Sequence, residues 1–312
     1  MLAASIQTFR GSIPALITPF LPGNAAVVDR QALGRLAIRV AERGSCAVVV
    51  CGSTGEGFAL DAKEHAEAVE TVVQALHGRI PVIAGICAPS TEGAVCLATA
   101  AERRGADALL VSAPPYVRPT QEGLGLHVRA VAGASRLPVV LYDVPSRVGV
   151  AFSDETIARL RSDGSIQGLK DATADLARTT RLRRLCGEDF LQFSGDDATA
   201  LAYRAAGGVG CISVTANIVP ALCAKLHAAW DARDVAKAIN MGERLAPLHA
   251  MLFLETNPIP VKAVLGLLGL CDPTPRLPLT RAARETMRQL TDIVPQLIAE
   301  DDICTAERYR AA

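Results

Sequence analysis

Eight short apolar runs recur along the chain, and each is followed by a turn and a longer stretch whose apolar residues fall at spacings of three and four. Short apolar runs are typical of strands buried on both faces, and the spacing between them is typical of amphipathic helices. The runs cover residues 13–17, 47–51, 82–84, 108–111, 139–142, 166–169, 191–193 and 211–214. Eight strands alternating with helices predict an α/β protein with a (β/α)8 TIM barrel. An open doubly wound sheet is the alternative.

This alternation stops near Pro220. Helical patterns then cover residues 221–232, 234–253, 257–270 and 280–299. We therefore expect a barrel domain over residues 1–220, a C-terminal helical domain over 221–300 that packs on the barrel, and a tail over 301–312. The chain is polar from Glu300 onward, and we expect this tail to be frayed.

Composition narrows the classes of partner. Formal charge is balanced, with 32 basic and 32 acidic residues, so we expect small-molecule substrates rather than a nucleic acid. The longest apolar runs, such as 47–51 and 261–268, are too short to span a bilayer, and the N-terminus lacks the pattern of a secretion signal. A cytoplasmic protein without membrane contact is the prediction.

Nine cysteines without a C-x-x-C pair and five scattered histidines predict reduced thiols and no metal site.

Lys170 stands out because it ends an apolar run that is predicted to be a buried strand. The chain has only five lysines, and the other four fall in predicted helices. In a barrel, the carboxyl ends of all strands meet at one mouth, which is where active sites lie. Burial there disfavours a charged ammonium, and a neutral amine can attack a carbonyl carbon to form an imine. Two ordinary alternatives remain: Lys170 reaches past the rim to water, or it pairs with Asp171.

Other polar side chains follow neighbouring strands and should reach the same mouth. Ser53 and Thr54 lie in CGSTGEG, whose glycines and hydroxyls could cradle a small anion or form an ordinary turn. Tyr142 could move protons near a lysine imine, and Arg147 could bind a carboxylate. Taken singly, a strand-end tyrosine and an exposed arginine are more often structural. Tyr116 lies in a proline-stiffened loop.

Nine stretches, taken together, resemble one known family. They are GSIPALITPF, GSTGEG, GRIPVIAG, PPYVRPTQEGL, YDVPSRVG, GLKDAT, SGDDATAL, ISVTAN and NPIPVK. They fall in order between Gly11 and Leu270, with the spacing of the dihydrodipicolinate synthase and N-acetylneuraminate lyase family of pyruvate-dependent class I aldolases. The resemblance implies a parallel barrel with a C-terminal helical domain, a homotetramer built as a dimer of dimers, and no metal or organic cofactor.

The resemblance also implies roles for individual catalytic residues. Lys170 matches the lysine that forms an imine with pyruvate, and Tyr142 matches the proton-transfer tyrosine beside it. Ser53 and Tyr116 match a hydroxyl relay, in which Tyr116 enters the site of the neighbouring subunit.

Four further positions match substrate-binding residues of the family. Thr54 corresponds to the residue that holds the pyruvate carboxylate, and Arg147 to the arginine at the entrance that binds the carboxylate of the aldehyde. Gly195 and Ile212 correspond to positions whose backbone lines the pocket.

The sub-function within the family depends on two positions. Arg147 in YDVPSR favours the branch with 4-hydroxy-tetrahydrodipicolinate synthase activity, which condenses pyruvate with L-aspartate 4-semialdehyde in lysine biosynthesis. Ser53, where synthases usually carry threonine, points mildly to a second hypothesis, an aldolase or dehydratase acting on a 2-oxo sugar acid. A non-catalytic binding protein on the same barrel is the third, because fold alone does not fix function.

One departure from the family concerns regulation. Synthases inhibited by lysine carry a histidine, an asparagine, a glutamate and a tyrosine at a dimer interface, where this chain has Ala62, Pro89, Gly93 and Pro115. Only His65 of that site is retained. Without the acid and the amide, the ammonium of lysine has no partner, so we expect no inhibition by lysine.

Overall fold

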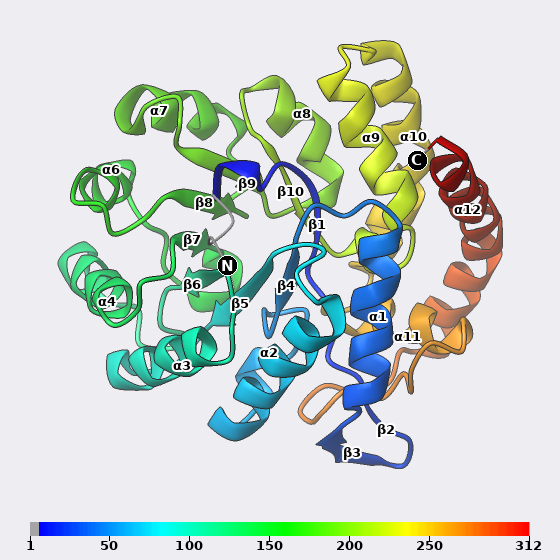
Figure 1. Cartoon of the computed structure of the whole chain (residues 1–312), viewed down its shortest axis with the longest axis horizontal. Helices are drawn as coiled ribbons and strands as arrows, with labels where there is room; N and C mark the ends of the chain where they lie inside the picture. The colour runs from blue at the N-terminus through cyan, green and yellow to red at the C-terminus, as the bar shows by residue number, and fades with distance from the viewer. Residues whose placement is uncertain (1–5, 312) are drawn as a thin grey trace.

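The computed structural model describes residues 6–311, and its centre is a closed sheet of eight parallel strands (Figure 1). The strands are β1 (Gly11–Pro14), β4 (Val48–Val50), β5 (Val82–Ile86), β6 (Ala108–Ser112), β7 (Val139–Asp143), β8 (Gly168–Asp171), β9 (Leu191–Ser194) and β10 (Gly210–Ser213). Their order is β1-β10-β9-β8-β7-β6-β5-β4. A bridge between Ala15 and Val49 brings the two ends of the sheet together. This confirms the predicted (β/α)8 TIM barrel and excludes the open sheet.

Each barrel strand is buried along its whole length, which explains why the sequence reads as short apolar runs. The surrounding helices are α1 (Arg30–Glu42), α2 (Ala62–Leu76), α3 (Thr91–Arg103), α4 (Gln121–Gly133), α6 (Asp154–Ser162), α7 (Leu176–Cys186) and α8 (Ala200–Ala205). Most of them begin at a polar side chain that accepts a hydrogen bond from the first turn. These caps are Asp29, Asp61, Ser90, Thr120, Ser153 and Asp175. The caps fix where each loop at the mouth ends.

Two smaller elements interrupt the regular alternation. An antiparallel ribbon of β2 (Phe20–Leu21) and β3 (Asn24–Val28) follows β1 and extends away from the barrel in Figure 1. The short helix α5 (Pro145–Val148) follows β7 and carries Arg147.

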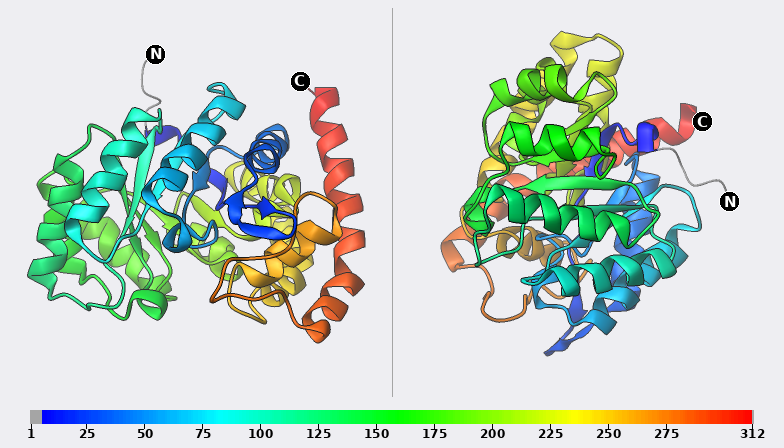
Figure 2. Two further views of the ribbon diagram at one scale, coloured as in Figure 1. Left: turned by 90° about the horizontal axis from the view of Figure 1, so that it is seen from below. Right: turned by 90° about the vertical axis from the view of Figure 1, so that its left-hand side faces the viewer.

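Four helices follow the barrel: α9 (Pro220–Asp231), α10 (Val235–Met251), α11 (Ile259–Leu267) and α12 (Arg284–Ala311). Their apolar faces form a second hydrophobic cluster, which continues into the barrel through residues such as Ile17 and Leu36. Figures 1 and 2 place α12 on the side of the molecule opposite α4 and α6. The division into domains at residue 220 stays a prediction.

The expectation of a frayed tail after Glu300 was wrong. Helix α12 continues to Ala311, and Asp301 is fully buried. The Leu222 N–H donates to Asp301 Oδ1 at 2.9 Å, and Arg43 Nη1 donates to Asp301 Oδ2 at 2.5 Å. The carboxylate therefore caps the first turn of α9 and pairs with the end of α1, which orders a segment that is polar in composition.

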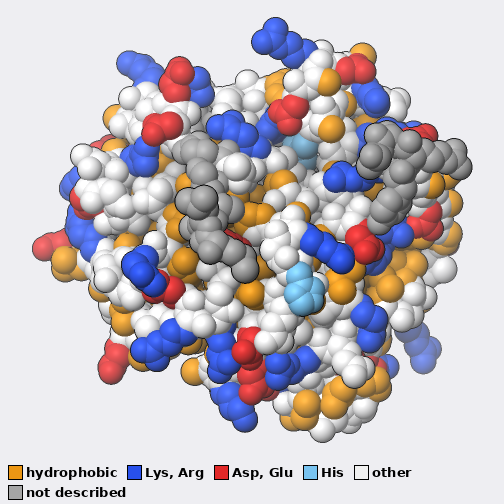
Figure 3. All heavy atoms as spheres, viewed as in Figure 1, with side chains coloured by type: hydrophobic (Ala, Val, Ile, Leu, Met, Phe, Trp, Pro, Cys, Tyr) orange, Lys and Arg blue, Asp and Glu red, His pale blue; other side chains and the backbone are white. Residues whose placement is uncertain are grey.

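Basic and acidic side chains are interspersed on the face shown in Figure 3. All nine cysteines are free thiols. Within residues 6–311, no helix combines the length and apolar character needed to span a membrane.

Candidate active site

Lys170 and Tyr142 lie side by side on neighbouring strands. The register of β7 and β8 pairs the two residues, and the Lys170 Nζ atom lies 4.2 Å from the centre of the Tyr142 ring. Lys170 is 4% exposed and Tyr142 is 8% exposed. The carboxylate of Asp171 lies 3.7 Å from Arg178, with which it forms its ion pair. Both alternatives for Lys170, a solvent-exposed amine and a pair with Asp171, are therefore wrong.

A cavity of about 220 Å³ opens beside Tyr142. Its polar lining side chains are Ser53, Ser112, Tyr142 and Arg147. Most of the remaining lining is apolar and comes from Cys51, Phe58, Ile86, Cys87, Leu110, Pro115, Val144 and Val148. Such a cavity, mostly apolar with a few convergent polar groups, is typical of a small-molecule site. The structure thus brings three predicted residues together around one space: Ser53, Tyr142 and Arg147.

Ser53 and Thr54 lie in the tight turn that follows β4. A Cβ atom at Gly85 on the adjacent strand would lie 2.5 Å from the carbonyl oxygen of Cys51, so only glycine allows this close approach. Thr18 Oγ1 donates to the carbonyl of Gly55 at 2.6 Å, which fixes the turn from the side of β1. Ser53 is half-buried and Thr54 is 1% exposed.

A buried ion pair anchors the same turn to the C-terminal helices. Lys262 Nζ lies 2.6 Å from Glu56 Oε1, and both side chains are fully buried. Lys262 also donates to the carbonyl of Thr18 at 3.0 Å, and the backbone N–H of Arg276 donates to Glu56 Oε2 at 2.8 Å. Burial lowers the pKa of Lys262, and the Glu56 carboxylate opposes this shift. Glu56 lies in the GSTGEG stretch but was not singled out from the sequence.

Asn257 connects two of the predicted substrate-binding residues. Its Nδ2 atom donates to Thr54 Oγ1 at 2.9 Å, and its backbone carbonyl accepts from Arg147 Nη2 at 3.1 Å. Asn257 is 4% exposed and belongs to the loop before α11. Sequence reasoning missed it, although it begins the NPIPVK stretch. The loop of the helical region thereby holds both residues in place.

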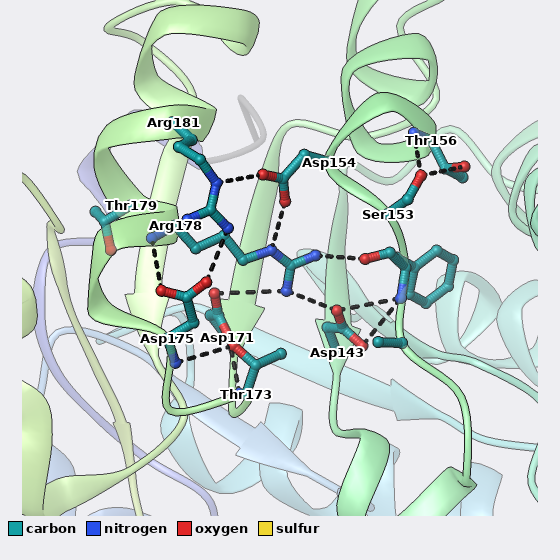
Figure 4. Close-up of polar contacts among 12 residues, drawn as sticks. Asp143, Ser153, Asp154, Thr156, Asp171, Thr173, Asp175, Arg178, Thr179 and Arg181 are labelled. Atoms are coloured by element: carbon teal, nitrogen blue, oxygen red, sulfur yellow. Dashed lines mark hydrogen bonds and ion pairs between the residues drawn. The ribbon is translucent and has the colours of Figure 1, made fainter.

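Figure 4 shows a cluster of charged side chains around Arg178, which includes the residues that follow Tyr142 and Lys170 on β7 and β8. Arg178 Nη1 donates to Asp143 Oδ2 at 2.7 Å, and Arg178 Nε donates to Asp154 Oδ1 at 2.8 Å. Asp143 and Asp171 directly follow Tyr142 and Lys170, so their side chains point to the opposite face of the sheet. Burial raises the pKa of Asp143, and Arg178 opposes this shift.

Tyr116 does not reach the cavity of its own chain. It lies in the loop between β6 and α4, is 95% exposed and adopts a φ of 76°. A positive φ is uncommon and strained for a bulky residue. Its predicted role in a neighbouring subunit stays a prediction.

Gly195 directly follows β9, and Ile212 lies on β10. The Gly195 N–H donates to the Asp171 carbonyl at 2.6 Å, and a Cβ there would lie 2.9 Å from the same oxygen. Glycine is therefore required for the chain to pass so close to the end of β8. Ile212 is 1% exposed and pairs with Ile13 of β1. Neither residue is among those that line the cavity beside Tyr142, so their backbone roles stay predictions.

The site has the parts that a lysine-dependent lyase needs, namely a buried amine, an adjacent phenol and a mostly apolar cavity beside the phenol. In the part of the chain that is described, no group of three or more His, Cys, Asp or Glu side chains is placed to hold a metal ion.

Comparison with known proteins agrees with this class. A model of the dihydrodipicolinate synthetase family matches residues 8–297. The 4-hydroxy-tetrahydrodipicolinate synthase of Bradyrhizobium diazoefficiens is 44% identical over 283 residues, which is 91% of this chain and 95% of the relative. The crystal structure of dihydrodipicolinate synthase from Aquifex aeolicus aligns with a TM-score of 0.89 at 39% identity, covering 92% of this chain and 98% of that one.

A third relative is the dihydrodipicolinate synthase of Acinetobacter baumannii, solved in complex with pyruvate. It has a TM-score of 0.89 and 40% identity, over 93% of this chain and 99% of that one. The chain belongs to the dihydrodipicolinate synthetase family. It is an enzyme of the lyase type.

Proposed function

We propose that this enzyme is a 4-hydroxy-tetrahydrodipicolinate synthase, which condenses pyruvate with L-aspartate 4-semialdehyde on the route through diaminopimelate to lysine. The names of its relatives support the activity. The observation that carries the proposal is the contact between Lys170 and Tyr142, in which a buried amine has no paired carboxylate among the described residues and lies against a phenol.

The first half of the reaction forms an enamine on Lys170. The neutral amine attacks the ketone carbon of pyruvate, and loss of water gives an imine. The Tyr142 hydroxyl moves the protons in these steps, with Ser53 as the relay on the cavity wall. The imine carbon then draws electrons from the methyl group, which loses a proton to give the enamine. We assign the pyruvate carboxylate to Thr54, whose Oγ1 accepts a hydrogen bond from Asn257 Nδ2.

The second half joins the two substrates. The enamine carbon attacks the aldehyde carbon of aspartate semialdehyde, whose carboxylate binds Arg147. The amine of the adduct then attacks the imine carbon, closes the ring and displaces Lys170 as a free amine. One water leaves in imine formation, and the lysine is regenerated. The apolar cavity keeps the enamine away from bulk water.

A second candidate is an aldolase or dehydratase that acts on a 2-oxo sugar acid with the same lysine and tyrosine. Two hydroxyls on the cavity wall favour it, those of Ser53 and Ser112. The acceptor aldehyde distinguishes the two candidates.

We also propose a cytoplasmic homotetramer in which Tyr116 completes the site of a neighbouring subunit. Its 95% exposure in a strained conformation supports this, because a strained and exposed aromatic side chain gains stability when a partner covers it. Tyr116→Phe should therefore lower turnover without changing the melting temperature of the assembled protein, as measured by calorimetry alongside the oligomeric state.

We propose in addition that lysine does not inhibit the enzyme. The side chain of Pro89 has no acceptor for an ammonium group, and Gly93 has no side chain. The His65 ring is used internally, with Nε2 2.8 Å from the carbonyl oxygen of Gly85. Activity should stay within two-fold of the uninhibited value in millimolar lysine. Half-maximal inhibition at submillimolar lysine would contradict this.

The proposed activity is tested with the purified protein, pyruvate and aspartate semialdehyde, coupled to the reductase that consumes the product. Lys170→Ala removes the amine, and Lys237→Ala on the exposed face of α10 is the matched control. We expect turnover in the wild type and in the control but none in Lys170→Ala. Borohydride should trap pyruvate on the same two active proteins, seen as a mass increase. Trapping without turnover of aspartate semialdehyde would instead favour the sugar-acid candidate.

A further inference from the structure

Ser112 extends the row formed by Lys170 and Tyr142. The register pairs Ser112 of β6 with Tyr142 of β7, and Tyr142 with Lys170 of β8, so the three residues lie side by side across three adjacent strands. Leu110 and Ser112 both line the cavity, as expected for alternate residues of one strand that face the barrel interior. All three members of the row are more than nine-tenths buried.

The hydroxyl of Ser112 has no hydrogen-bond partner among the described residues. The side chain is 6% exposed, and its Oγ atom is buried and unpartnered. The hydroxyl lies close to the thiol of Cys87, because it opposes the rise in the pKa of Cys87 that burial causes. A thiol is a weak partner, so it does not replace a full hydrogen bond. Buried polar groups in folded proteins are nearly always paired, and an exception at a cavity wall points to a ligand.

The place of Ser112 in the cavity limits what it can bind. Lys170 and Tyr142 are engaged with pyruvate, and Arg147 is engaged with a carboxylate in the proposed reaction. Around Ser112 the wall is apolar, with Ile86, Cys87 and Leu110. A substituent that forms hydrogen bonds is therefore favoured at this point of the wall, whereas a bare methylene would leave the hydroxyl unpaired.

We propose that Ser112 determines specificity for the acceptor aldehyde by forming a hydrogen bond to an amine or hydroxyl substituent of its carbon chain. The inference rests on the proposed function, because it requires that the cavity bind an acceptor after pyruvate. An ammonium group would donate to Ser112 Oγ, and a hydroxyl group could donate or accept. Acceptors that lack the substituent are disfavoured because the buried hydroxyl is then left without a partner.

The test compares two matched pairs of acceptors. Aspartate semialdehyde and succinate semialdehyde differ only in the amine, and glyceraldehyde and propanal differ only in their hydroxyls. The proteins are the wild type, Ser112→Ala, Ser112→Thr, and Ser162→Ala on the exposed end of α6 as control. The measured quantity is the ratio, within each pair, of the second-order rate constants for addition of the acceptor to the pyruvate-loaded enzyme, because the adduct of succinate semialdehyde has no amine that could displace Lys170 by ring closure. The KM for pyruvate and the extent of borohydride trapping are measured alongside.

In the wild type, the acceptor that carries the substituent should be preferred. Ser112→Ala should lower this preference about 10-fold, which corresponds to one hydrogen bond to a charged or buried group. The KM for pyruvate and the trapping should stay within two-fold. Ser112→Thr, which keeps the hydroxyl, should recover most of the preference, and Ser162→Ala should match the wild type.

The outcomes separate this proposal from the proposed function. If Ser112→Ala keeps the wild-type ratio in the pair that is turned over, the role of Ser112 is refuted while the synthase activity stands. If only the hydroxylated pair is turned over and its ratio falls in Ser112→Ala, the synthase activity is refuted and the role of Ser112 stands. If the wild type turns over none of the four acceptors, both are refuted.

Discussion

The amine of Lys170 lies 4.2 Å from the centre of the Tyr142 ring, on the neighbouring strand of the barrel. An aromatic face can hold an amine in place, but it cannot take up a proton, for which the phenol hydroxyl is needed. Changing the hydroxyl alone separates the contact of the amine with the ring from proton transfer by the phenol.

Tyr142→Phe keeps the ring and removes the hydroxyl. We expect kcat to fall by about 100-fold or more, the range typical of a lost proton-transfer group, with an unchanged melting temperature. Steady-state kinetics with pyruvate and the acceptor measure the effect. Tyr203→Phe is the matched control, since Tyr203 is also a buried tyrosine but lies on α8 and does not line the cavity. A Tyr142→Phe enzyme as active as this control would remove Tyr142 from the proton path.

Asn257→Ala should weaken the binding of pyruvate. The substitution removes the donor to Thr54, and the shortened side chain loosens the loop whose carbonyl holds Arg147. We expect the KM for pyruvate to rise roughly 10-fold, as for loss of one buried hydrogen bond near a charged substrate. Asn240→Ala, at an exposed position of α10, is the control. Equal KM values in the two variants would show that Asn257 does not position Thr54.

Arg178→Met should be strongly destabilising. Arg178 is buried against Asp143, Asp154 and Asp171, so its loss leaves buried carboxylates without a counter-charge. Removing one partner of a buried ion pair costs about 3–5 kcal/mol of unfolding free energy. Urea unfolding provides the measurement.

Arg181→Met is the comparison for this effect. Arg181 also bridges two aspartates in Figure 4, but its side chain is 49% exposed. Because exposed ion pairs contribute little to stability, Arg181→Met should lower the unfolding free energy far less than Arg178→Met does. If Arg178→Met and Arg181→Met lost similar amounts of unfolding free energy, burial of the cluster would not determine how much it contributes to stability.

Stability should fall in mild acid because of His227. Burial, together with the nearby Arg204, lowers the pKa of His227 to about 3, and Asp197 opposes the shift. The unfolded histidine titrates near 6.5, so the unfolded state binds one more proton between these values, and falling pH favours unfolding. We expect a loss of about 2 kcal/mol from this residue between pH 7.5 and pH 5.

His227→Asn isolates that contribution. Burial also lowers the pKa of His65 and His127, so the variant should still lose some stability in acid, but less steeply than the wild type. Urea unfolding midpoints measured from pH 5 to 7.5 give the dependence of stability on pH for the wild type and for His227→Asn. His77→Asn, at the exposed end of α2, is the control. Parallel slopes for the wild type and His227→Asn would contradict the prediction.

The barrel could be predicted because parallel strands buried on both faces must be short and apolar, and all eight runs overlap observed strands. The ends of the strands were predicted less accurately. The predicted strand 166–169 stops before Lys170, whereas β8 runs from Gly168 to Asp171. Two charged residues fit inside a buried strand because Lys170 faces the mouth and Asp171 meets Arg178, a partner that only the packing of α7 supplies.

Three residues that line the cavity could be singled out from the sequence because they lie in recognisable stretches, namely Ser53, Tyr142 and Arg147. Asn257 and Ser112 were missed for a physical reason. Asn257 acts through Thr54, which is 203 positions away in sequence, and Ser112 looks like an ordinary strand end until the register places it beside Tyr142. The anchoring of α12 through buried Asp301 was missed for the same reason, since its partners lie at the end of α1 and at the start of α9.

The ion pair between Glu56 and Lys262 couples the turn that carries Ser53 and Thr54 rigidly to helix α11. The two residues are 206 positions apart, and neither charge can move into water without crossing packed structure. A displacement of α11 must therefore either separate two buried charges, at high cost, or carry the turn with Ser53 and Thr54 along with it. Any change that shifts α11 on the outside of the barrel will consequently be transmitted to the centre of the active site.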